Sequence, residues 1–140
     1  MILLWNSSEM TVSLTLIDGD ERWAYEWKAE RNLARDMLGY LRDRLAEHSR
    51  SFQDLTGIGV FRGPGSYTGL RIGLTVLNTI ASACEILIVG ETGKNWEAVA
   101  LERLNAGQTD KIVLPEYGGE AHVSSFLKLL AGVAIRAYNI

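Results

Sequence analysis

The segment Arg62–Gly73, which reads RGPGSYTGLRIG, limits the possible folds of this chain more than any other stretch. The run Leu55–Phe61 before it is short and apolar, which is typical of a buried strand. The run Leu70–Ala83 after it contains no proline and is rich in Leu, Ile, Val and Ala, as expected of a buried helix. Gly63, Pro64 and Gly65 permit a sharp change of direction between the two. The segment therefore predicts a strand, a tight turn and a helix in direct succession.

The polar side chains of this turn indicate capping or ligand contact. Ser66 or Thr68 can accept a hydrogen bond from the free amides of the first helical turn. Such a turn can hold an anion, but it lacks the lysine and the spacing of a P-loop. Arg71 lies in the first helical turn, where a cation opposes the helix dipole, so it is either paired with an acid or used by a partner. Arg62 is open to the same two interpretations, and these four residues are the predicted anion or partner contacts.

The run GPGSYTGLRIG at residues 63–73 resembles the hallmark segment of the bacterial TsaB (YeaZ) family, usually written GPGSFTGLRIG. Only Tyr67 differs, where the hallmark has Phe. The resemblance implies an α/β fold of the actin-like ATPase superfamily, also called ASKHA and built on an RNase H-like module. It also implies a role in forming threonylcarbamoyladenosine on tRNA. In that family the protein is a non-catalytic partner of the TsaD subunit, which holds the metal and performs the transfer.

The spacing of apolar residues predicts the other elements of the chain. Alternation of apolar and polar residues favours strands, and recurrence on one face favours helices. The predicted strands are Met1–Trp5, Met10–Ile17, Arg22–Lys28, Leu55–Phe61 and Ile86–Val89, and the predicted helices are Arg31–His48, Leu70–Ala83 and Asn95–Leu104. The resulting order, βββαβαβα, is that of the first lobe of the actin-like superfamily.

The chain is predicted to consist of one lobe and a tail. Residues 1–104 are expected to form the TsaB-like N-terminal lobe. Family members normally continue into a second lobe of similar size, so residues 105–140 are interpreted as a remnant of a deleted lobe. A short strand at Lys111–Leu114 and a helix at Ser124–Ala137 are expected there. This tail is expected to pack on the same domain or on a partner.

Composition excludes several classes of protein. The chain has 140 residues, of which 47% are hydrophobic, so it can bury one core. Its net charge of −3 disfavours a dedicated nucleic-acid binder, so we expect only indirect contact with tRNA. Cys84 is the single cysteine, so no disulfide framework is possible and a cytoplasmic location is expected. The sequence shows no membrane-spanning run and no signal peptide.

Catalytic chemistry finds little support in the sequence. In the superfamily that the resemblance implies, an acidic residue near the end of the first strand often helps to hold a metal–phosphate group. Asn6 stands at that place, and an amide cannot supply the anionic charge that magnesium prefers. His48 and His122 are far apart, and Ser66 is not in a G-x-S-x-G elbow. We therefore predict no catalytic residue, no metal, no cofactor, and neither ATPase nor peptidase activity.

The helix after the turn is apolar on two faces and must be buried on both. Gly69 and Gly73, four residues apart, would let another backbone approach closely. The Arg31–His48 helix of the same domain can supply that contact. The resemblance implies more, namely a bundle of these two helices with TsaD, or with a second copy when TsaD is absent. The predicted interface residues are Met37, Leu41, Gly69, Gly73, Val76, Leu77 and Ile80.

The sequence thus predicts a non-catalytic scaffold that pairs with a TsaD-like protein. Two alternatives stay open. One is a nucleotide-binding phosphotransferase of the actin-like superfamily, which would bind ATP with this lobe alone. The other is a dimerising module without a TsaD partner.

Overall fold

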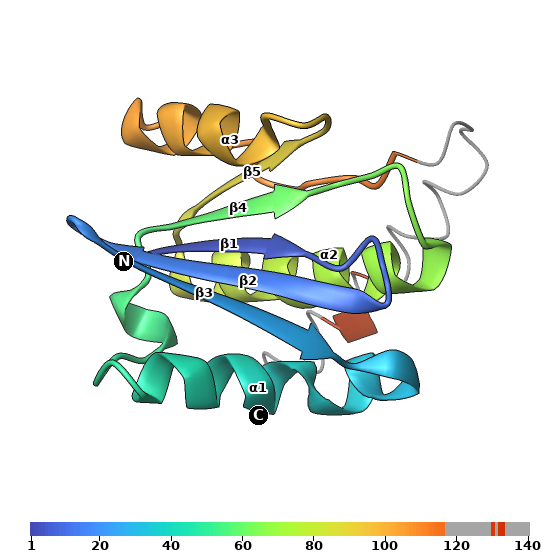
Figure 1. The fold of residues 1–140 in the computed structure, drawn as a ribbon. Coiled ribbons are helices and arrows are strands. Elements are labelled where there is room, and N and C mark those ends of the chain that lie inside the picture. The colour runs from blue at the N-terminus through green and yellow to red at the C-terminus, as the bar shows by residue number, and fades with distance from the viewer. Residues whose placement is uncertain (117–129, 131, 134–140) are drawn as a thin grey trace.

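The computed structural model describes residues 1–116, 130, 132 and 133. Its centre is a five-stranded mixed sheet with the strand order β3-β2-β1-β4-β5 (Figure 1). Strands β1, β4 and β5 run parallel, whereas β2 is antiparallel to both of its neighbours. The strands are β1 (Ile2–Asn6), β2 (Thr11–Asp18), β3 (Glu21–Lys28), β4 (Gly57–Phe61) and β5 (Leu87–Glu91).

Three helices cover the two faces of this sheet, with α1 and α2 on one face and α3 on the other (Figure 1). Short 3-10 turns at Glu30–Asn32 and Phe52–Asp54 flank α1. The larger hydrophobic core lies between the sheet and the α1–α2 layer, and a smaller core lies under α3. The helices are α1 (Leu33–Ala46), α2 (Tyr67–Cys84) and α3 (Trp96–Asn105).

The predicted α/β class and the order βββαβαβα are confirmed, with boundaries within a few residues of those expected. The predicted strand Lys111–Leu114 is wrong, because these residues form a bend and an irregular segment. The predicted helix Ser124–Ala137 lies mostly outside the described residues. Of that helix, Leu130 is helical, and it is buried in the larger core. The division into a lobe of residues 1–104 and a tail stays a prediction.

Aromatic side chains attach β3 to α1. The Trp23 ring stacks on His48 with 3.8 Å between centroids, and Trp27 stacks on Tyr40 at 4.2 Å. The Tyr25 hydroxyl donates a hydrogen bond to the Glu47 carboxylate at 2.9 Å. Burial, with the hydrogen bond and negative charge of Glu47, raises the pKa of Tyr25 to about 12. One face of β3 is therefore occupied by contacts within the chain, including the contact with His48.

Candidate partner-binding site

The glycine turn joins β4 to α2 as the sequence predicts. Gly63 has φ +120°, a conformation that residues with a side chain rarely adopt. Ser66 caps α2, because its Oγ accepts a hydrogen bond from the Gly69 amide at 3.4 Å. The Ser66 amide in turn donates to the Ser8 carbonyl oxygen at 2.7 Å. The turn is thus held against the segment that follows β1.

Three glycines at intervals of four residues make this close approach possible. A Cβ at Gly65 would lie 2.5 Å from the Ser8 Cβ, and one at Gly69 would overlap the Ser7 carbonyl oxygen. At Gly73 a Cβ would lie 2.6 Å from Trp5 Nε1 and would also overlap the Ser7 hydroxyl. The three positions that lack a side chain therefore lie against the end of β1 and the residues after it.

This packing corrects the prediction that the Gly69–Gly73 edge points outward toward a partner. The edge faces inward, and the approaching backbone is that of Ser7 in the same chain. The other predicted interface residues also lie mainly inside this chain. Met37, Leu41 and Leu77 are fully buried, Ile80 is 7% exposed, and Val76 is half-buried.

Ser7 is the residue at this contact that the sequence did not single out. Trp5 Nε1 donates a hydrogen bond to the Ser7 hydroxyl at 2.9 Å, and that hydroxyl donates to the Gly69 carbonyl oxygen at 2.8 Å. Asn6 holds the next residue, since its side-chain oxygen accepts from the Ser8 amide at 2.9 Å. The polar residues after β1 thus stabilise the turn.

Arg62, just before the hallmark segment, and Arg71 within it both have partners. The Arg62 guanidinium lies 3.5 Å from the Glu116 carboxylate and donates to the Leu114 carbonyl oxygen at 3.4 Å. Arg71 lies over the Tyr67 ring at 5.1 Å and donates to its hydroxyl at 3.4 Å. Its buried Nε has no hydrogen-bond partner within the described part of the chain. Arg62 is thus paired with an acid, whereas no acidic partner of Arg71 is found among the described residues.

Asn78 joins α2 to the segment 109–116. Its side-chain oxygen accepts from the Val113 amide at 2.8 Å, and its nitrogen donates to the Val113 carbonyl at 2.9 Å. Both residues are buried, at 3% and 2% exposure.

Asp110 attaches the same segment beside β5, because its carboxylate accepts hydrogen bonds from Arg103 and from the Gly90 amide. Burial opposes ionisation of this carboxyl, but these hydrogen bonds lower its pKa overall.

The outer surfaces of α1 and α2 remain as a candidate docking face, which we call the helix-pair face and define as Leu38, Ile72 and Val76. Leu38 of α1 is 54% exposed, although α1 otherwise buries its large aliphatic side chains. Ile72 and Val76 of α2 are half-buried at the border of the larger core. The two helices contact each other on the same side of the sheet (Figure 1).

Two kinds of site are not found among residues 1–116, 130, 132 and 133. No group of three His, Cys, Asp or Glu side chains there could hold a metal ion. None of the helices described is long and apolar enough to cross a membrane.

Comparisons with known proteins identify the family. The family model described as TsaD, tRNA N6-adenosine threonylcarbamoyltransferase, matches residues 27–109, more than half of the 140 residues. The tRNA threonylcarbamoyladenosine biosynthesis protein TsaB of Bacillus subtilis (strain 168) is 34% identical over 88 residues, covering 62% of this chain and 38% of the relative. The chain belongs to the TsaB (YeaZ) family.

Solved structures place this TsaB-family chain in the predicted fold. It superposes on YeaZ from Pseudomonas aeruginosa with a TM-score of 0.61 and 25% identity, covering 65% of this chain and 43% of that one. A structure titled as similar to peptidase YEAZ from Pseudomonas aeruginosa gives the same TM-score and identity over 42% of its chain. The α/β fold of the actin-like superfamily is thereby confirmed. The chain spans about two fifths of the length of these relatives.

Proposed function

We propose that this chain is a non-catalytic partner of a TsaD-like protein in the threonylcarbamoyladenosine modification of tRNA. The observation that carries the proposal is the match of more than half of the chain to the threonylcarbamoyltransferase model, together with the hallmark turn. The name of the Bacillus subtilis relative supports the same process. A partner in tRNA modification works where tRNA is found, so we place the chain in the cytoplasm.

The proposed contact is the helix-pair face rather than the glycine edge. Burying a Leu side chain fully contributes about 1.5–3 kcal/mol, and Leu38 is more than half exposed, at 54%. Around it, Arg35 is paired with Asp36 at 2.9 Å and Arg42 with Asp43 at 3.3 Å. An apolar centre with a rim of paired charges is the usual anatomy of a protein–protein interface.

The proposed role leaves catalysis to the partner. The Asn6 side chain, at the place where the superfamily often has an acid, accepts a hydrogen bond from the Ser8 amide. It therefore stabilises the turn after β1, which supports a non-catalytic role for this chain. The net charge of −3 supports indirect contact with tRNA, through the partner.

A charge placed on the helix-pair face should weaken partner binding. Leu38→Arg puts a cation at the apolar centre, so we expect capture of the TsaD-like protein to fall about tenfold or more, because burying an unpaired charge is costly. The matched control is Val99→Arg on α3, on the opposite side of the sheet, where Val99 is 39% exposed. Calorimetric titration with the TsaD-like protein of the same organism measures both.

The control variant makes the result decisive. Both substitutions replace an exposed aliphatic residue, so both should unfold at nearly the wild-type temperature. Equal capture by both variants, or a loss with Val99→Arg alone, would show that the helix-pair face is not the docking site.

A further inference from the structure

Strand β3 forms one edge of the sheet (Figure 1). It pairs with β2 along its whole length, from Glu21 opposite Asp18 to Lys28 opposite Thr11. Among the described residues, no other backbone hydrogen bond reaches β3. An edge strand of eight residues therefore presents unpaired N–H and C=O groups, which are a template for another strand.

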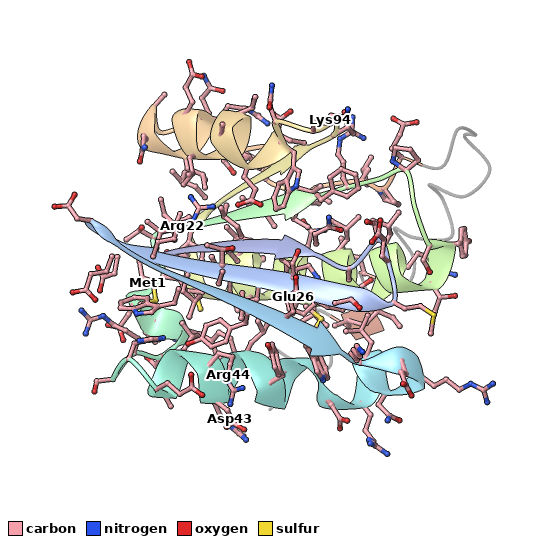
Figure 2. The ribbon with its side chains drawn as sticks, in the orientation of Figure 1. Met1, Arg22, Glu26, Asp43, Arg44 and Lys94 are labelled. Carbon is pink, nitrogen blue, oxygen red and sulfur yellow. The ribbon has the colours of Figure 1, made fainter. Side chains whose placement is uncertain are left out.

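The two faces of β3 differ in character. Trp23, Tyr25 and Trp27 are half-buried and face α1 and the turn after it, as their contacts with Tyr40, Glu47 and His48 show. The intervening residues lie on the opposite face and are exposed; Figure 2 labels two of them, Arg22 and Glu26. Along that face the order is Asp20 in the turn, then Arg22, Ala24, Glu26 and Lys28.

The charges on this face are self-complementary: if two copies of the strand are placed antiparallel with their Ala24 residues opposite each other, opposite charges face each other. Reading outward from Ala24 in one direction gives a cation and then an anion, and in the other direction an anion and then a cation. We propose that β3 pairs antiparallel with β3 of a second copy of this chain, about a two-fold axis at Ala24. The axis brings Arg22 of each copy opposite Glu26 of the other and joins the two sheets into one.

The same register also suits the face toward α1. With Ala24 on the axis, Trp23 of one copy lies opposite Tyr25 of the other, which is a favourable cross-strand aromatic pair. Two pairs of opposite charges and two aromatic pairs are therefore formed at once. A two-fold arrangement of this kind closes on itself, so the pairing ends at a dimer.

Neighbouring registers are disfavoured by charge. Side chains that lie opposite each other must be on the same face of the sheet. The register can therefore shift only so that odd-numbered residues stay opposite odd-numbered ones and even-numbered residues opposite even-numbered ones. An axis at Tyr25 would place Arg22 opposite Lys28, and an axis at Trp23 would place Asp20 opposite Glu26. Like charges directly opposite each other are destabilising. The charge order thus favours the axis at Ala24.

The contact that Arg22 already makes is compatible with this pairing. Its guanidinium donates to the Glu97 carboxylate of α3 at 2.7 Å, but the side chain stays 53% exposed. A guanidinium carries five N–H donors, so it can serve two carboxylates. The pairing uses a surface different from the helix-pair face and does not rest on the proposed function. It also replaces the predicted self-association through the Gly69–Gly73 edge, which is buried.

A charge swap tests the pairing in the isolated chain. Arg22→Glu and Glu26→Arg each place like charges at both symmetry-related pairs, so each should weaken dimerisation about tenfold. The double variant restores opposite charges and should dimerise within about threefold of wild type. Arg22 and Glu26 lie about 13 Å apart in one strand, beyond the screening length, so recovery cannot come from a contact within one copy. Sedimentation velocity gives the dissociation constants.

The control removes the internal partner of Arg22. Glu97→Gln breaks the ion pair with α3 and leaves β3 unchanged, so dimerisation should stay within about twofold of wild type. A loss of dimerisation as large as that caused by Arg22→Glu would show that the contact with α3 is responsible, and it would contradict the pairing. A wild-type chain that stays monomeric at high concentration, or single variants that dimerise as well as wild type, would overturn it as well.

Cross-linking tests the position of the axis. In a Cys84→Ser background, Ala24→Cys places two thiols across the axis with Cα atoms about 4.5–5.5 Å apart, within the range of a disulfide. Mild oxidation should give a covalent dimer. The control, Lys28→Cys, leaves the two thiols about 27 Å apart and should not cross-link. Equal cross-linking by both variants would show that β3 does not pair about Ala24.

Discussion

Gly73→Arg is expected to leave no folded population of this chain, and even Gly73→Ala should destabilise it by about 1–3 kcal/mol. The reason is that the folded chain leaves no room for a side chain at position 73. A Cβ at this position would lie 2.6 Å from Trp5 Nε1 and would overlap the Ser7 hydroxyl. The Trp5 ring is fully buried and cannot move away, and the Ser7 hydroxyl is held by hydrogen bonds to Trp5 and Gly69.

Urea unfolding of Gly73→Ala measures this effect, with Gly39→Ala as the matched control. Both changes replace glycine by alanine inside a helix, which by propensity alone is favourable by up to about 1 kcal/mol. At Gly39 the new Cβ would lie 3.6 Å from an Arg42 side-chain nitrogen, which is ordinary contact, so this control should be neutral or stabilising. A Gly73→Arg variant that folds with the wild-type midpoint would contradict the inward orientation of the glycine edge.

Asn78→Leu should destabilise the chain by about 2–6 kcal/mol, although leucine has the same branching and the same number of side-chain heavy atoms as asparagine. The substitution leaves the buried Val113 amide and carbonyl without partners, and each orphaned group costs about 1–3 kcal/mol. Thr79→Ala is the control on the next residue, where the hydroxyl donates to the Thr75 carbonyl of the same helix. That change should stay within about 0.5 kcal/mol.

Hydrogen exchange at Val113 separates attachment of the segment from general stability. In wild type the Val113 amide is buried and bonded, so it should exchange slowly. In Asn78→Leu it should exchange much faster than the amides of β1. A variant as stable as wild type, with the Val113 amide still protected, would show that Asn78 does not hold the segment 109–116.

The element order was predictable because each element carries its own local pattern. Trp23, Tyr25 and Trp27 alternate along β3, and Leu33, Met37 and Leu41 repeat along one face of α1. The glycine turn was predictable too, since Gly63 requires a backbone that other residues avoid. These signals are contained within a few consecutive residues.

The orientation of the glycine edge could not be predicted in the same way. Gly69 and Gly73 indicate that something passes closely, but not what it is. In this fold it is Ser7, more than sixty residues earlier in the chain, as the separation of 62 between Ser7 and Gly69 shows. Asn78 gives a similarly incomplete signal, because a single amide in an apolar helix does not name its partner. The residues that contact the glycine edge and Asn78 could therefore be identified only from the tertiary structure.

The central claim, that the helix-pair face docks a TsaD-like protein, is tested most directly by methyl NMR. The chain is labelled at Leu and Val methyl groups and titrated with the unlabelled TsaD-like protein of the same organism. The methyl signals of Leu38 and Val76 are predicted to shift or broaden, whereas those of Val99 on α3 stay unchanged. A spectrum that does not change, or changes at Val99 without changes at Leu38, would contradict the proposed docking face.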